Sequence, residues 1–97
     1  MTGAPTAETF TQHVGKPISL ADGHKLTLVE IKRPGSPAAG AAARDGGFTL
    51  ILRGPRAPVA TEGMHRLDFE SGKSFDLYLI PIHTASRDHQ DYQIVFN

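Results

Sequence analysis

The residue types best suited to chemistry lie near the C-terminus, where His83 and His89 precede Asp91. Two imidazoles and a carboxylate are suitable ligands for zinc or iron. Their spacing matches no established metal-binding motif, and polar residues are ordinary in surface loops. These three residues are therefore only a weak candidate metal site, and we expect no cofactor.

The same segment holds Ser86, Asp88 and His89, which are the residue types of a hydrolytic triad. A working triad also needs a strained nucleophile turn, an oxyanion hole and a base that a third group orients. Adjacency in the sequence supplies none of these. No activated nucleophile, acid–base pair or cofactor motif stands out elsewhere, so we expect a protein that is not an enzyme.

Strands must position these side chains, because the second half of the chain contains four runs with apolar residues at every second position. A period of two is typical of pleated strands, and turn residues separate the runs. The four expected strands are residues 48–52, 63–69, 75–82 and 91–97.

The N-terminal part of the chain predicts one short helix over residues 7–14. Thr6 is a candidate N-cap, and Gly15 stands where a helix commonly ends. Phe10 and Val14 lie four residues apart and so share one helical face. We expect both side chains to cover one end of a β-sheet core.

Two further strands are expected between this helix and the middle of the chain. Residues 17–20 predict an edge strand, because proline is tolerated where its missing donor is not needed. Residues 21–24 contain an Asp-Gly turn, and residues 25–32 form the next strand. The apolar positions of that strand shift by one between Leu28 and Val29, which indicates a β-bulge.

Six strands and one helix in 97 residues leave short connections, so strands adjacent in sequence are expected to pair. We predict a single all-β domain over residues 1–97, built as a small barrel or two-layer sandwich of mostly antiparallel strands with a short N-terminal helix. Residues 1–5 are expected to be a loose N-terminus. Residues 34–47, rich in alanine, glycine and proline, are expected to form a flexible loop.

The composition excludes several classes of function. Ten basic residues balance ten acidic ones, so the charge of a dedicated nucleic-acid or anionic-membrane binder is missing. The chain has no cysteine, which excludes disulfides and thiol nucleophiles. The sequence shows no signal peptide, and no apolar run approaches the ~20 residues that span a bilayer. We therefore expect a cytoplasmic protein, at least when it is made.

The expected strand at residues 75–82 is apolar on both faces. If Phe75, Leu77 and Leu79 point inward, three of the four residues on the opposite face are also apolar. Burying one such side chain stabilises a protein by about 1.5–3 kcal/mol, so the helix, a second sheet layer or another chain should cover this face. The predicted contact face comprises Ile51, Tyr78, Ile80, Ile82 and Val95, with Arg53 at its rim.

Arg53 has two interpretations, because it ends an expected strand and the turn residues Gly54 and Pro55 follow it. Its guanidinium could bind a carboxylate of a partner at the rim of the contact face. It could instead pair with an acid of its own chain while Gly-Pro makes the turn. The internal pair is the favoured interpretation.

The strand sequences themselves resemble a family of small bacterial domains of unknown function. The similarity lies in residues 48–55, 63–67, 77–82 and 92–97, and it extends over nearly the whole chain except the alanine-rich loop. At residue 65, histidine replaces the aromatic residue usual in that family. The resemblance implies that the gene of this protein lies beside genes for phage-tail-collar-type proteins. It therefore implies that the protein is an accessory of a tail-like fibre. It carries over no catalytic residue.

We therefore expect a non-catalytic protein-interaction or assembly module that binds a protein partner or a second copy of itself. Its partner is not expected to be a nucleic acid or a membrane. The alternative is a small-ligand-binding barrel, for example for a saccharide. In that case Tyr78 and Tyr92 would provide stacking surfaces, and residues 83–90 would provide polar contacts.

Overall fold

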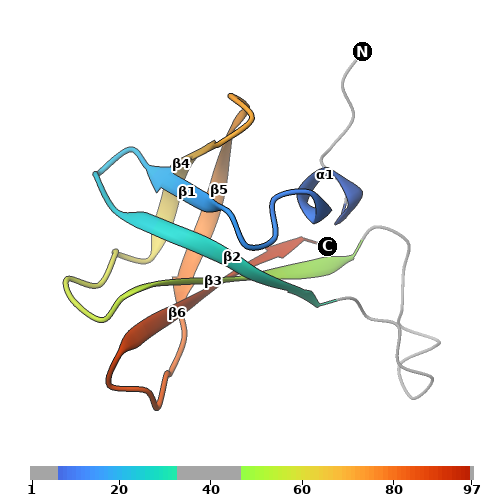
Figure 1. The fold of residues 1–97 in the computed structure, drawn as a ribbon. Helices are drawn as coiled ribbons and strands as arrows, with labels where there is room; N and C mark the ends of the chain where they lie inside the picture. Colours follow the sequence, from blue (N-terminus) through green and yellow to red (C-terminus); the bar gives the residue numbers. More distant parts are fainter. Residues whose placement is uncertain (1–6, 33–46, 97) are drawn as a thin grey trace, which may run out of the picture.

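The computed structural model describes residues 7–32 and 47–96, which form one helix and six strands (Figure 1). The elements are α1 (Ala7–Thr11), β1 (Pro17–Leu20), β2 (Lys25–Lys32), β3 (Phe48–Pro55), β4 (Gly63–Phe69), β5 (Ser74–Pro81) and β6 (His89–Phe96). The expected loose N-terminus, the candidate N-cap Thr6 and, except for Gly47, the expected flexible loop lie outside the described residues. No helix in the described part is long and apolar enough to cross a membrane.

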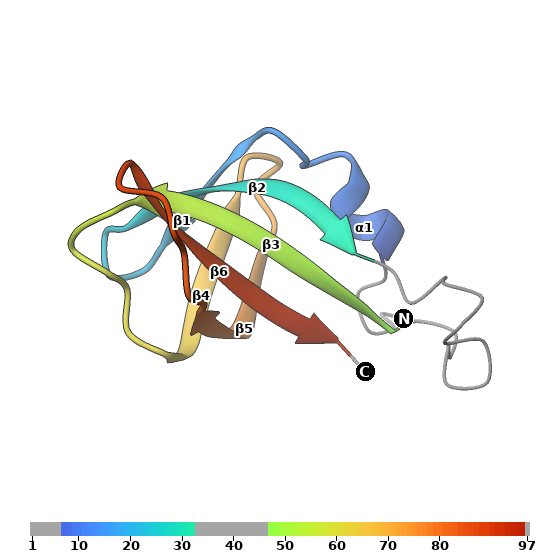
Figure 2. The same ribbon diagram turned by 90° about the horizontal axis from the view of Figure 1, so that it is seen from below.

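The six strands form a closed antiparallel barrel in the order β1-β2-β3-β6-β5-β4 (Figures 1 and 2). The predicted all-β class is confirmed, and of the two predicted architectures the barrel is the correct one. The barrel consists of two three-stranded meanders, β1–β2–β3 and β4–β5–β6, joined where β1 pairs with β4 and β3 with β6. The prediction that strands adjacent in sequence pair is therefore wrong for β3 and β4. Residues 56–62 connect these two strands, but the strands are not neighbours in the barrel.

Two local features of the first meander follow from the sequence. β1 pairs with strands on both sides, so its prediction as an edge strand is wrong; Pro17 is tolerated because it is the first residue of the strand. The predicted bulge in β2 is confirmed. Leu28 pairs with Leu52 of β3, but Glu30 then pairs with Ile51, so one residue of β2 is left over.

The core consists of the inward side chains of all six strands. Alternation directs every second residue to the inside of the barrel, and these positions are almost all aliphatic or aromatic. Burying each of them contributes about 1.5–3 kcal/mol. The strand side chains with at most 2% exposure are Ile18, Leu26, Leu28, Leu50, Leu52, Leu67, Leu79, Tyr92 and Ile94.

One end of the barrel is covered by α1, which contributes a single large side chain to the core. Phe10 is fully buried, and its ring centroid lies 5.5–6.0 Å from those of four other rings. With five residues α1 is too short to be stable alone in water, so its position depends on this contact. The four rings around Phe10 belong to Phe48, Phe69, Phe75 and Phe96.

The helix ends three residues earlier than predicted. Thr11 is its last residue, and residues 12–15 form turns. Val14 is consequently 43% exposed, so the prediction that it covers the core is wrong. The turn brings position 13 against the core in its place, and the His13 ring is buried 4.9 Å from the Phe69 ring. Burial lowers the pKa of His13.

Candidate functional site

Two of the three predicted metal ligands, His89 and Asp91, lie together at the start of β6, but His83 does not join them. His89 Nε2 lies 3.5 Å from Asp91 Oδ1, whereas the side chain of His83 is exposed. Within residues 7–32 and 47–96, no three histidine or acidic side chains gather closely enough to hold a metal ion.

The residues of the candidate triad have local structural roles. Ser86 Oγ accepts a hydrogen bond from the backbone N–H of Asp88 at 2.9 Å, and the Ser86 carbonyl accepts one from Arg56. The ring of His89 faces Asp91. These contacts fix the shape of the connection, as serine commonly does in turns.

Arg53 makes the internal ion pair that the sequence favoured. Its Nε donates to Asp91 Oδ1 at 2.9 Å, and its Nη2 lies 3.4 Å from Asp91 Oδ2. The two residues are register partners on β3 and β6, so the pair is built into the barrel wall. The hydrogen bond to Asp91 raises the pKa of Arg53. Asp91 is also held by its backbone N–H, which donates to Thr84 Oγ1 at 2.9 Å.

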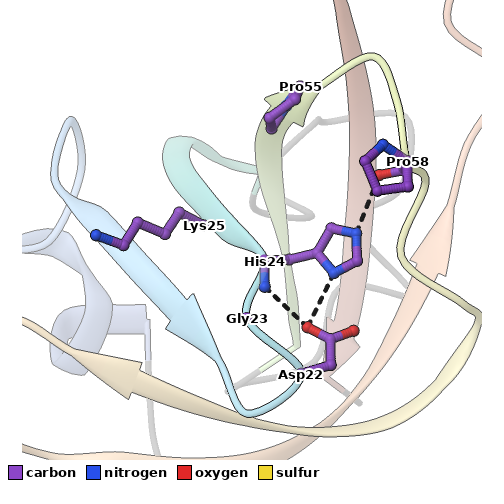
Figure 3. Close-up of a pocket in the computed structure, with 6 residues that line it drawn as sticks. All are labelled: Asp22, Gly23, His24, Lys25, Pro55 and Pro58. Carbon is purple, nitrogen blue, oxygen red and sulfur yellow. Dashed lines mark hydrogen bonds and ion pairs between the residues drawn. The ribbon is translucent and has the colours of Figure 1, made fainter.

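An open cavity of about 420 Å³ lies between the β1–β2 turn and the segment after β3 (Figure 3). His24 Nδ1 lies 2.9 Å from Asp22 Oδ1, and Nε2 donates to the Pro58 carbonyl at 3.0 Å. The adjacent Asp22 carboxylate raises the pKa of His24. An imidazole between two acceptors satisfies both only when it is protonated, so this histidine ties two loops together. The cavity is lined by Asp22, Gly23, His24, Lys25, Pro55 and Pro58.

The predicted contact face divides into covered and exposed residues. Ile51 is only 8% exposed, so its own chain covers it and it offers a partner little surface. Ile80 and Ile82 are half-buried. Tyr78 and Val95 are each 48% exposed and lie on neighbouring strands of the barrel. The exposed part of the face is therefore the outside of β5 and β6.

Met64 extends this exposed surface onto β4 and was missed in the sequence. It is 63% exposed and is the register partner of Tyr78. Alternation could have identified it, since Met64 shares the outward face of its strand with Arg66 and Asp68. Tyr78 Oη donates to Glu62 Oε2 at 2.9 Å, and this carboxylate raises the pKa of Tyr78. We define the outer patch as Met64, Tyr78, Ile80 and Val95.

β5 and β6 are joined along only part of their length. Their ladder in the described residues pairs Ile80 with Gln93 and Pro81 with Tyr92. Beyond this point, residues 74–79 of β5 pair with β4 alone and residues 94–96 of β6 pair with β3 alone. Figures 1 and 2 show the end of β6 diverging from the beginning of β5. We call this opening the β5–β6 seam.

The alternative of a saccharide stacking on two tyrosines is not supported at Tyr92. This residue is fully buried, and its hydroxyl accepts a hydrogen bond from the backbone N–H of Ala60 at 2.9 Å. The prediction that Tyr92 provides a stacking surface is therefore wrong. Strand alternation directs it into the core together with Ile94.

The fold defines a class of protein: a small closed antiparallel barrel of six strands, with a short helix over one end. Residues 5–96 match the domain of unknown function DUF6916, and the chain belongs to that family. The resemblance to a domain of unknown function is thus confirmed. No curated protein and no solved structure matches the chain.

Proposed function

We propose that this protein is a non-catalytic interaction module that binds another protein through the outer patch. The observation that carries the proposal is the exposure of Met64, Tyr78 and Val95, which are 63%, 48% and 48% exposed on three consecutive strands. Met64 and Tyr78 are register partners, and exposed apolar surface of this kind on a small domain commonly marks an interaction site. Its removal from water would contribute about 25 cal/mol per Å² to binding.

The polar groups of the barrel support a non-catalytic role. Arg53 is paired with Asp91, the Ser86 hydroxyl accepts a backbone hydrogen bond, and His24 bridges two loops. Arg53 and His24 hold distant segments together, and the Ser86 hydroxyl fixes a local turn. The side chains of Met64, Ile80 and Val95 in the outer patch, in contrast, are apolar and make no such hydrogen bond.

The resemblance to small bacterial domains encoded beside phage-tail-collar-type proteins supports a more specific form of the proposal. In this form the partner belongs to a phage-tail-like fibre or complex, and the domain is its accessory. Synthesis in a bacterial cytoplasm is part of the same proposal, and cell fractionation tests it. Assembly into a homo-oligomer is a separate prediction, which the molar mass in solution tests.

Two matched substitutions test the role of the outer patch. Val95→Asp places a charge in the patch, and Val14→Asp places the same charge at a valine of similar exposure, 48% against 43%. Val14 adjoins Gly15, which bonds to Leu28 of β2, so it lies on the opposite side of the barrel from β5. Both variants should fold, because neither valine belongs to the core.

The tagged wild type and both variants would be used to capture proteins quantitatively from lysates of the source cell. We expect at least one protein to be retained by the wild type and by Val14→Asp but lost with Val95→Asp. Thermal denaturation of each variant confirms that it is folded. Identical sets of captured proteins for the two folded variants would refute the proposed function.

A further inference from the structure

We propose that the β5–β6 seam is a strand-addition site, which accepts an extended segment of a partner protein with apolar and basic residues in alternation. This inference rests on the proposed function and deepens it by naming the kind of partner. Strand addition is a recurrent mode of peptide recognition, in which backbone hydrogen bonds supply affinity and alternate side chains supply specificity. Three properties of the seam support it.

The first property is the direction of the backbone groups along β5. In an antiparallel ladder, successive residues turn their N–H and C=O groups towards opposite neighbours. Ile82 N–H donates to the Asp91 carbonyl of β6 at 3.1 Å. The backbone groups of Tyr78 and Asp76 therefore also face the β6 side, whereas those of Leu77 face β4.

The same alternation directs the backbone groups of Val95 in β6 towards β5. Continuing the register of the Ile80–Gln93 pair would place Tyr78 opposite Val95, but the described ladder does not reach them. The donors and acceptors of Asp76, Tyr78 and Val95 thus border an opening in the barrel wall. Another extended backbone is the structure that pairs with a row of such groups.

The second property is incomplete burial of the core beside the seam. Phe75 and Leu77 of β5 and Phe96 of β6 point inward and pack against the core, yet they are only partly buried. The inward residues Leu50 and Leu67, each of which has a register partner on both neighbouring strands, are completely buried. Apolar side chains on an added strand would complete the cover, so the segment needs apolar residues at alternate positions.

The third property is the charge beside the seam. Asp76 is exposed, and its register partner Arg66 is bonded to Asp68 at 3.1 Å. Asp76 makes no ion pair within the described part of the chain, and Glu62 adds a second carboxylate at the hydroxyl of Tyr78. An incoming strand with basic residues complements these charges. A second copy of β5 would instead bring another Asp76 to the same edge, which disfavours self-pairing.

Amide hydrogen exchange of the isolated protein, followed by NMR, tests the opening itself. We expect the amides of Asp76, Tyr78 and Val95 to exchange at least about tenfold faster than those of Leu77 and Leu79, which face β4. Equal protection of both sets would show that the seam is closed and would overturn the inference.

Binding is tested with synthetic octapeptides that alternate lysine and valine. We expect the peptide to slow exchange at Tyr78 and Val95 by about tenfold at saturation, and a glutamate–valine peptide to bind more weakly. Two further lysine–valine peptides carry N-methyl groups, one on all its lysines and the other on all its valines. Each of them has therefore lost the N–H donors along one of its two edges as a strand. At least one of them should fail to bind, because an added strand needs its backbone donors.

Charge reversal provides the matched variants. Asp76→Lys should reverse the preference between the lysine and glutamate peptides. Glu30→Lys makes the same change at an exposed position of β2, across the barrel, and should leave the preference unaltered.

Undiminished binding of both N-methylated peptides would overturn strand addition while leaving the outer patch as a binding surface. A dimer in solution that protects the amides of Asp76 and Tyr78 would assign the seam to a second copy and overturn the heterologous partner. Neither result depends on the capture experiment with Val95→Asp. Failure of the inference and failure of the proposed function are therefore distinguishable.

Discussion

Phe10→Ala is the substitution that most directly tests how the helix is held to the barrel. The ring is fully buried and contacts four other aromatic rings, while the rest of α1 supplies only Ala7 to the core. A five-residue helix has no stability of its own. Removing the ring should therefore release α1 as well as leave a cavity at that end of the barrel.

The expected loss of stability follows from the surroundings of the ring. Truncation of a buried phenylalanine to alanine typically costs about 3–5 kcal/mol, and the cost is smaller where the site can relax. Phe75 and Phe96, two of its neighbours, are only partly buried beside the β5–β6 seam, so water and side-chain movement can fill part of the space. We expect a decrease of about 3 kcal/mol in the free energy of unfolding, which is a large share of the stability of a small domain.

Urea denaturation followed by circular dichroism measures this decrease, with Val14→Ala as the control. The sequence placed both residues on the core-facing side of the helix, but Val14 is 43% exposed and should lose less than about 0.5 kcal/mol. Similar losses for the two variants would refute the described position of α1. A loss below about 1 kcal/mol for Phe10→Ala would do the same.

Two further outcomes follow from buried polar groups. Tyr92→Phe removes the acceptor of the Ala60 N–H and should lower the free energy of unfolding by about 1–2 kcal/mol, as measured by urea denaturation. Tyr78→Phe removes an exposed hydrogen bond to Glu62 and should have a much smaller effect. Because burial lowers the pKa of His13, the unfolded chain binds more protons than the folded one below about pH 6.5. His13 should therefore contribute a loss of stability between pH 7 and pH 5, whereas His24, whose pKa is raised, contributes in the opposite direction. His13→Gln should make stability fall less, or rise more, over this range than in the wild type; an unchanged slope would contradict the burial of His13.

Local sequence signals predicted the strands well, because alternation and turn residues act within a few positions. β1, β2 and β4 have the bounds expected from the sequence, and the bulge in β2 was visible as a shift of phase. β3 continues to Pro55 and β6 begins at His89, because these polar ends pair with each other. The sequence of these two strand ends has no alternation of apolar residues from which the longer strands could be predicted. Their extension depends on a partner strand far away in the sequence.

The order of the strands could not be read from local patterns. Nothing in residues 56–62 indicates that β4 pairs with β1 and leaves β3 to pair with β6. The end of α1 was missed for a related reason. The turn after Thr11 exchanges the roles of His13 and Val14, and helical spacing alone does not reveal that turn.

The candidate site was partly predictable. Alternation correctly placed Tyr78 and Val95 outside the barrel, and the same rule would have added Met64. Whether an outward residue is exposed depends on the side chains beside it, which explains why Ile51 is covered. The β5–β6 seam depends on how far two strands stay together, and this is a property of the closed barrel as a whole.

The pairing of two meanders also constrains how this chain acquires its structure. Ile18 of β1 pairs with Phe69, roughly 50 residues later, and Phe48 of β3 pairs with Phe96 at a similar separation. Neither meander can bury its apolar face until the other is present, so closure requires bringing together segments that are distant along the chain. Loop entropy opposes such contacts before they are formed, which places the protein among slowly folding topologies. During that delay the outer edges of both meanders, on β1, β3, β4 and β6, are unpaired, and misassembly between chains would begin at these edges.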